Sequence, residues 1–128
     1  MLLRGAPGSG KSDLALRLID QGARLVADDW VEVTAEGEML WASAPAAIAG
    51  MMEVRGVGVL RLPPAPRARL RLVADLVPSE AVERLPEPAS MTIDGLSLPL
   101  VRLAPLEASA VAKLRLLMRA LDDDIIVS

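Results

Sequence analysis

The sequence predicts an α/β domain, in which a β-sheet with flanking helices is organised around a glycine-rich loop. Residues 5–12 read Gly-Ala-Pro-Gly-Ser-Gly-Lys-Ser and fit the phosphate-loop (P-loop) pattern of glycine, four residues, glycine, lysine and serine. The apolar residues 1–3 precede this loop, and the helix-like run 13–19 follows it. Because a strand, a glycine-rich turn and a helix in this order are the context in which the pattern binds phosphate, we prefer this interpretation to an ordinary turn capped by Ser12.

The residue types of the loop suit a polyphosphate. Its glycines can adopt positive φ angles, and they let backbone N–H groups approach a phosphate closely. The helix that begins near Lys11 has unpaired N–H groups and a partial positive charge at its N-terminus. In such loops the lysine reaches the β- and γ-phosphates of ATP, and the serine hydroxyl binds Mg²⁺. The expected phosphate-binding residues are Gly5, Ala6, Pro7, Gly8, Ser9, Gly10, Lys11 and Ser12.

Composition limits the chemistry that the chain can perform. The 128 residues are expected to form one domain, which can bury roughly two-thirds of its unfolded surface. The sequence contains no cysteine and no histidine, so general bases must be carboxylates, and oxygen ligands favour Mg²⁺ as the metal. A net charge of −3 and an aromatic content of 2% disfavour a nucleic-acid partner. No apolar run has the length of a membrane span and no signal peptide is recognisable, so we expect a cytoplasmic protein with no membrane partner.

The first predicted elements place two carboxylates after a strand. Residues 1–4 are expected to form a short strand and residues 11–21 the first helix, with Gly22 as its C-terminal cap. The apolar residues 24–27 then predict a strand that ends in Asp28 and Asp29 and resembles a Walker B element. One carboxylate could hold Mg²⁺ or its water while the other accepts a proton from an incoming hydroxyl. Two solvated turn carboxylates are the alternative, which the preceding loop disfavours.

The remaining elements are short strands separated by glycine- and proline-rich breaks. A hairpin is predicted from residues 30–34 and 39–42 around Gly37, and a short helical turn from residues 45–52. The proline-rich residues 63–67 and the polar residues 78–88 are expected to be surface loops. The apolar stripe of the second helix predicts core packing, and a partner-facing stripe is the alternative. The further predicted strands are 57–62, 69–77, 91–94 and 96–103, and the second helix is 107–121.

Residues 53–60 contain two glycines separated by one apolar residue. This spacing indicates a backbone that passes close to another group. Glu53 and Arg55 flank the approach with opposite charges. On spacing alone, a surface ion pair before a strand is the simpler interpretation.

Three segments in fixed order resemble the catalytic domain of bacterial HPr kinase/phosphorylase. They are the loop at residues 5–12, Gly-Ala-Arg-Leu-Val-Ala-Asp-Asp at 22–29, and Met-Glu-Val-Arg-Gly-Val-Gly-Val at 52–59. The match is dense over residues 1–62, and Glu-Arg-Leu at 83–85 resembles a family segment that carries a catalytic arginine. The resemblance implies a mixed α/β kinase core related to the nucleotide-binding core of phosphoenolpyruvate carboxykinase.

The resemblance also implies an activity. It implies ATP- and Mg²⁺-dependent phosphorylation of a serine on HPr, the small phosphocarrier protein of the sugar phosphotransferase system, in the regulation of carbon metabolism. Full-length relatives reverse this reaction by phosphorolysis with inorganic phosphate. By the resemblance, Lys11 binds phosphate, and Ser12 and Glu53 ligate Mg²⁺. Asp29, with Asp28 beside it, accepts the serine proton in the forward direction and returns it in reverse.

The resemblance assigns further roles and has clear departures. Arg84 would stabilise the transferring phosphoryl group, and Arg55 and Gly56 belong to the signature that shapes the site. The relatives carry a catalytic histidine upstream of the loop, and this sequence has no histidine. Their N-terminal regulatory domain and late glycine–arginine segment are not recognisable either. We therefore expect the short form of the family, with kinase activity better supported than phosphorylase activity.

Two alternatives stay open. One is a nucleotide-binding sensor or interaction module of the same family that is impaired in catalysis. The other is a kinase for a small metabolite, which the segment at residues 52–59 disfavours. Whether the chain forms a homo-oligomer is also open, because the hexamer of the long enzymes need not carry over to the short form.

Overall fold

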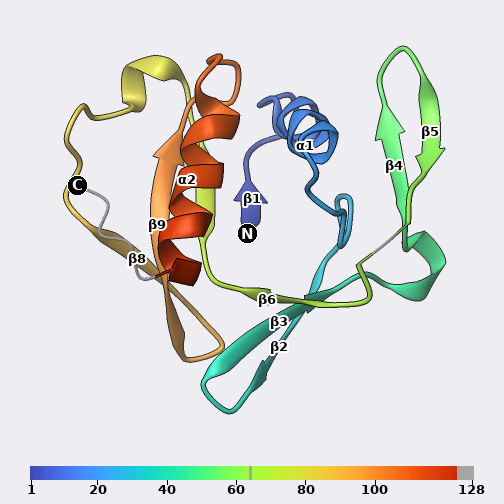
Figure 1. The fold of residues 1–128 in the computed structure, drawn as a ribbon, viewed down its shortest axis with the longest axis horizontal. Helices are drawn as coiled ribbons and strands as arrows, with labels where there is room; N and C mark the ends of the chain where they lie inside the picture. Colours follow the sequence, from blue (N-terminus) through green and yellow to red (C-terminus); the bar gives the residue numbers. More distant parts are fainter. Residues whose placement is uncertain (64, 124–128) are drawn as a thin grey trace.

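The fold is centred on a mixed four-stranded sheet (Figure 1). The structure is a computed structural model and describes residues 1–63 and 65–123. β1, β7 and β9 run parallel, and β8 is antiparallel to β9. The expected α/β class with a mixed sheet is therefore confirmed. The order of the sheet is β1 (Leu2–Arg4), β7 (Val73–Leu76), β9 (Leu96–Leu103) and β8 (Ala89–Ile93).

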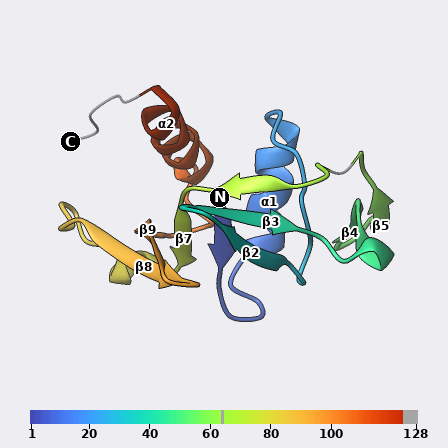
Figure 2. The ribbon, with the colours of Figure 1, turned by 90° about the horizontal axis from the view of Figure 1, so that it is seen from below.

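Two helices, α1 (Lys11–Asp20) and α2 (Ala110–Asp123), bury their apolar stripes against one face of this sheet. Figure 2 shows α2 lying over the strands of the sheet. The α2 stripe is core packing, as the spacing of its apolar residues predicts, and Leu114 is completely buried. No helix within the described residues has the length and apolarity to cross a membrane. The buried residues of this core are Leu14, Leu18, Leu72, Ala74, Leu76, Leu103, Ala110 and Leu114.

The opposite face of the sheet packs against a second sheet. Its strands are β2 (Glu32–Glu36), β3 (Met39–Ser43) and β6 (Ala68–Leu70), in that order. β2 and β3 form the predicted antiparallel hairpin around Gly37. Because side chains alternate along a strand, β7 contributes to both faces and is buried on both. The buried residues between the two sheets are Leu40, Ala42, Leu70, Val73 and Leu98.

A separate hairpin covers the outer side of α1. It consists of β4 (Met51–Val54) and β5 (Gly58–Arg61), which pair antiparallel and project at the right of Figure 1. Met52 and Val54 are buried in a third apolar cluster, against which Ala15 and Ile19 of α1 pack. The strand predicted at 57–62 is thus the second half of a hairpin whose first half the sequence analysis did not identify. Two single 3-10 turns complete the described secondary structure, η1 (Ala46–Ile48) and η2 (Ser79–Ala81).

The strand predicted at residues 24–27 is wrong. These residues cross irregularly from α1 to β2 and belong to no sheet of the described structure. Leu25 is buried in the cluster under the β4–β5 hairpin, whereas Val26 packs against the cluster between the two sheets. The apolar pattern therefore reflects burial against two different clusters. A backbone hydrogen bond from Ala65 to the carbonyl of Leu25 holds the segment in place at 3.0 Å.

The single strand predicted at residues 69–77 is also wrong. It is two strands, β6 and β7, which belong to different sheets. Arg71 and Leu72 carry the chain from one sheet to the other, and the Leu72 carbonyl accepts a hydrogen bond from the N–H of Leu2 at 2.9 Å. The predicted strands at 91–94 and 96–103 are confirmed as β8 and β9, while the second helix begins at Ala110 rather than at residue 107.

We expect the core between α2 and the sheet to dominate the stability of the fold. Leu114→Ala removes a side chain that is 0% exposed and should lower the free energy of unfolding by about 2–5 kcal/mol. Leu116→Ala, on the opposite face of the same helix and 50% exposed, should cost less than about 1 kcal/mol. Urea denaturation of both variants measures the difference. Equal losses for the two variants would show that α2 does not pack as described.

Candidate functional site

Three connections gather at one edge of the central sheet. The glycine-rich loop (residues 5–12) follows β1, residues 77–88 follow β7, and residues 104–109 follow β9. Because the three strands are parallel, their carboxyl ends lie at the same edge. Open α/β sheets bind ligands in the crevice at such an edge. The fold therefore directs attention to the glycine-rich loop and to the two connections beside it.

The conformation of the glycine-rich loop suits an anion. Gly8 and Gly10 have φ angles of 81° and 97°, in the left-handed region that favours glycine. Gly10 caps α1 but offers no side-chain hydrogen bond, so the first turn of the helix keeps its N–H groups for another partner. The Ser9 hydroxyl is buried and has no hydrogen-bond partner among the described residues. A buried polar atom without a partner and an uncapped helix start together fit a bound phosphate group.

Gly5 gives this loop its tight start. A Cβ atom at Gly5 would collide with the Ser9 Oγ atom, and the N–H of Ser9 donates to the Ala6 carbonyl at 3.0 Å. The chain therefore folds back on itself directly after β1. The close approach explains the glycine at this position without appeal to its φ angle.

The acidic pair at residues 28–29 lies beside the loop, although it does not follow a strand. The Asp29 Oδ1 atom is 3.7 Å from the Lys11 Nζ atom. Asp29 has a φ angle of 62°, and its side chain is 69% exposed. Asp28 points elsewhere, because its Oδ2 atom accepts a hydrogen bond from the backbone N–H of Glu53 at 3.2 Å. The two carboxylates thus have different tasks: Asp29 faces the lysine, and Asp28 ties the segment to β4.

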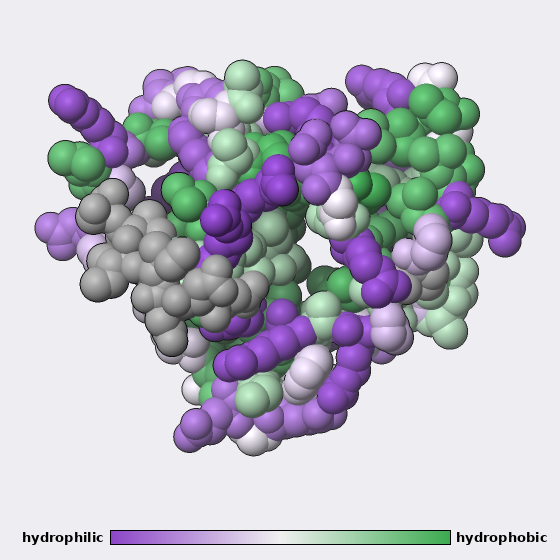
Figure 3. Space-filling model, viewed as in Figure 1, coloured by the Kyte–Doolittle hydropathy of each residue, from purple (hydrophilic) through white to green (hydrophobic). Residues whose placement is uncertain are grey.

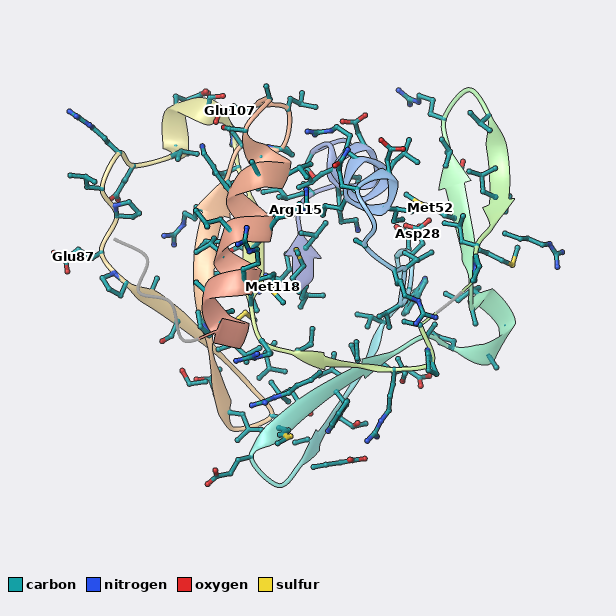
Figure 4. All side chains as sticks on the ribbon, viewed as in Figure 1. Asp28, Met52, Glu87, Glu107, Arg115 and Met118 are labelled. Atoms are coloured by element: carbon teal, nitrogen blue, oxygen red, sulfur yellow. The ribbon has the colours of Figure 1, made fainter. Side chains whose placement is uncertain are left out.

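A pocket of about 280 Å³ joins these groups. Lys11, Ser12, Asp28 and Asp29 line it, together with apolar residues of β1, α1 and β6. The face seen in Figure 3 is hollowed between α1 and the sheet of β2, β3 and β6. Figure 4 shows Asp28 beside Met52, where the acidic segment meets β4. The structure therefore brings four of the predicted site residues together around one opening.

The other predicted residues lie outside this pocket. Glu53 is exposed, whereas its neighbours in β4 are buried against α1. Arg55 and Gly56 form the exposed turn of the β4–β5 hairpin, where Gly56 has a φ angle of 83°. Arg84 is exposed in the connection between η2 and β8. Within the described residues, the side chains of Glu53, Arg55 and Arg84 form no hydrogen bond or ion pair with the glycine-rich loop, so their roles rest on the resemblance alone.

A metal ion would need ligands beyond the protein's carboxylates. The described residues contain no group of three or more Asp or Glu side chains that could hold one. Mg²⁺ commonly binds through one or two protein oxygens together with substrate phosphates and water. Ser12, which lines the pocket, and the nearby carboxylates fit that mode of binding.

An ion pair that the sequence analysis missed fixes the start of the loop. Arg4, the last residue of β1, forms two hydrogen bonds with Asp75 of β7, of 2.7 and 2.9 Å. The side-chain hydrogen bond from Arg4 to Asp75 raises the pKa of Arg4 above its usual range. Lone opposite charges in two otherwise apolar strands were the signal that could have predicted this contact.

Comparison with known proteins gives one consistent result. The model of the HPr Serine kinase C-terminal domain family matches residues 1–65. An HPr kinase/phosphorylase of Listeria monocytogenes serotype 4a (strain HCC23) is 48% identical over 63 residues, which are 48% of this chain and 20% of that protein. An HPr kinase/phosphorylase of Geobacillus thermodenitrificans (strain NG80-2) is 39% identical over 111 residues, which are 77% of this chain and 36% of that protein. The chain thus spans about a fifth to a third of the length of these relatives.

A solved structure shows the same fold. The structure of the Hpr(Ser) kinase/phosphatase from Coxiella burnetii has a TM-score of 0.82 to this chain. The two share 24% sequence identity, and the match covers 96% of this chain and 87% of that one. The likeness therefore extends over the elements after residue 65, beyond the part that the family model matches.

We predict that the Arg4–Asp75 pair stabilises the start of the loop more than a surface pair would. The two side chains are only 40% and 25% exposed, so Asp75→Asn should lower the free energy of unfolding by about 1–2 kcal/mol after allowance for solvent screening. Glu36→Gln breaks a similar two-bond pair with Arg67 that is half exposed, and should cost less than about 1 kcal/mol. Chemical denaturation of both variants tests this, and an equal loss at the two sites would contradict it.

Proposed function

The chain belongs to the family of HPr serine kinase C-terminal domains, and we propose that it is a catalytic domain that uses Mg²⁺ and ATP to phosphorylate a serine of HPr. Two relatives are named HPr kinase/phosphorylase, and the matching structure is of an Hpr(Ser) kinase/phosphatase. The observation that carries the proposal is the position of Asp29, 3.7 Å from Lys11 at the glycine-rich loop. A kinase of this kind would work in the cytoplasm, where ATP and HPr are both present.

The glycine-rich loop is proposed to bind the β- and γ-phosphates of ATP. The N–H groups at the start of α1 and the ammonium of Lys11 would attract the phosphate oxygens. The Ser9 hydroxyl, buried without a partner, would donate a hydrogen bond to one of them. These groups are already in place, so little reorganisation is needed on binding. The loop therefore acts as a P-loop in this proposal, within a core related to that of phosphoenolpyruvate carboxykinase.

Ser12 and Glu53 are the residues proposed to hold Mg²⁺. Both offer oxygen ligands, Ser12 in the first turn of α1 and Glu53 next to the hydrogen bond that Asp28 accepts. When bound, Mg²⁺ would neutralise charge on the phosphates. Asp28 would help to position the Glu53 carboxylate, because it accepts a hydrogen bond from the Glu53 backbone N–H.

Asp29 is proposed to be the general base. Its exposure leaves room for the hydroxyl of a protein substrate to approach, and a left-handed φ angle in a non-glycine residue is a feature that clusters at functional sites. The serine oxygen would form a bond to the γ-phosphorus as the bond from that phosphorus to the β–γ bridging oxygen breaks and ADP leaves. The serine proton would pass to Asp29. Lys11 would exchange its contact with Asp29 for the phosphates when ATP binds.

Arginines would complete the site. Arg84, in the connection that follows β7, is proposed to stabilise the transferring phosphoryl group. Arg55 and Gly56, in the turn between β4 and β5, would shape the side on which the substrate approaches. In the reverse reaction, an oxygen of inorganic phosphate would form a bond to the phosphoserine phosphorus as the bond from that phosphorus to the serine oxygen breaks. Pyrophosphate would leave, and Asp29 would return the proton to the serine oxygen.

One observation favours a second candidate function. Arg84 and Arg55 lie outside the pocket that Lys11 and Asp29 line. A site without a catalytic arginine could bind nucleotide and yet transfer no phosphoryl group. The chain would then be a nucleotide-dependent sensor or interaction module. Such a module would bind nucleotide but transfer no phosphoryl group.

We predict that Asp29→Asn separates binding from catalysis. The variant should bind Mg·ATP as tightly as the wild type, or more tightly, because it removes a negative charge next to Lys11. Its rate of phosphoryl transfer to HPr should fall by about two to four decades, the usual size of a general-base contribution. Asp20→Asn, at the exposed C-terminal end of α1, is the matched control and should keep wild-type turnover. Near-normal turnover of Asp29→Asn would refute the assignment of the base.

Lys11→Ala should abolish both nucleotide binding and transfer. The variant loses the cation that contacts the β- and γ-phosphates, and calorimetric titration with Mg·ATP measures the loss. Lys113→Ala is the control, because Lys113 lies on α2 and pairs with Glu107. If Lys11→Ala bound Mg·ATP with unchanged affinity, the glycine-rich loop would not be the phosphate site.

A further inference from the structure

We infer that Arg17 is a positioning residue, which holds the glycine-rich loop in its phosphate-binding shape through the turn at Pro105 and Leu106. This inference rests on the proposed role of the loop. Arg17 lies in the last turn of α1, about one turn after Asp13. Its Nη2 atom donates a hydrogen bond to the carbonyl oxygen of Pro105, and its Nε atom donates to the Asp13 Oδ2 atom at 3.0 Å.

The turn that Arg17 holds lies directly against the loop. A Cβ atom on Gly10 would be 3.2 Å from the Pro105 Cγ atom and 3.3 Å from the Leu106 Cδ2 atom. Pro105 is buried, and the turn is closed by a hydrogen bond from the N–H of Glu107 to the Ala104 carbonyl at 3.3 Å. Pro105 and Leu106, in the connection between β9 and α2, therefore form a wall beside Gly10, the residue that precedes α1.

Gly10 depends on this wall. It caps α1 in a left-handed conformation, with no side chain of its own to hold it there. A glycine has more accessible backbone conformations than any other residue, so it is ordered only by what surrounds it. Pro105 and Leu106 supply part of that order, because they close the side on which a Cβ atom would lie, and the Gly10 carbonyl accepts a hydrogen bond from the Leu14 N–H at 3.0 Å. The N–H groups of Lys11 and Ser12, which follow at once, take their direction from it.

Arg17 is not needed to hold α1 in the fold. Leu14 and Leu18 of the same helix are 0% and 6% exposed in the main core. The Arg17 side chain is 32% exposed, and Asp13, which orients it, is 57% exposed. Loss of the guanidinium should therefore leave the helix in place and release the Pro105 turn. ATP would then have to order the loop on binding, which weakens its affinity.

The test compares three variants of the full chain. Arg17→Met keeps the length of the side chain and removes its donors, Arg17→Lys keeps the charge and one donor group, and Arg115→Met changes an exposed arginine of α2 (Figure 4). For each variant, calorimetry gives the dissociation constant of Mg·ATP, steady-state kinetics with HPr gives KM and kcat, and thermal unfolding gives Tm.

We expect Arg17→Met to raise KM and the dissociation constant of Mg·ATP about tenfold, the effect of losing one hydrogen bond from a charged donor. Its kcat should stay within about twofold and its Tm within a few degrees. Arg17→Lys should recover part of the affinity, and Arg115→Met should match the wild type. The ratio of the Mg·ATP dissociation constant of Arg17→Met to that of the wild type should persist at high salt, where long-range charge effects are screened.

Two results would overturn the inference while leaving the proposed function intact. An unchanged KM with a lower rate and a lower Tm would show that Arg17 only stabilises the fold. If the ratio of the two Mg·ATP dissociation constants fell to one at high salt, only the charge of Arg17 would act on the nucleotide. If the wild type itself bound no Mg·ATP, the proposed function would fail and the inference with it.

Discussion

The parallel pairing of β1 with β7 determines where the glycine-rich loop begins. The Arg4–Asp75 ion pair fixes the carboxyl ends of the two strands to each other, one residue before the loop. β7 is buried on both faces, so β1 pairs with a strand that is held firmly in the core. Gly5 then turns the chain sharply, and α1 starts at Lys11 with its free N–H groups at the sheet edge. The positions of Lys11 and Ser12 follow from this one strand pair.

Charge at the site is divided between residues that bind and residues that position. Asp29 faces Lys11, whereas Asp28 is bonded to the backbone of β4 and Asp13 to Arg17. Neighbouring carboxylates in the sequence therefore serve separate structural purposes. This division is compatible with the proposed phosphate site in an acidic chain of net charge −3, because the attraction for phosphates would be local and would come from backbone N–H groups and one lysine.

Local patterns in the sequence predict local structure well. The first helix and the hairpins at Gly37 and Gly95 are encoded by short-range spacing, and they form as predicted. The phosphate-binding role of residues 5–12 stays a prediction. Leu25 and Val26 misled the prediction, because burial against two clusters produces the same apolar run as a strand. Contacts between distant residues are not encoded by local spacing. The lone charges of Arg4 and Asp75 in apolar strands indicate that each needs a partner, but this pair spans 71 positions and the Arg17–Pro105 bond spans 88, so only the folded chain shows which residues meet.

The intact mass of HPr after incubation with this protein and Mg·ATP tests the central claim most directly. The account predicts one added phosphoryl group on a serine of HPr, which is absent when Lys11→Ala replaces the wild type. Unchanged HPr, in a mixture where calorimetry shows that the protein binds Mg·ATP, would contradict the kinase assignment and support a nucleotide-dependent sensor.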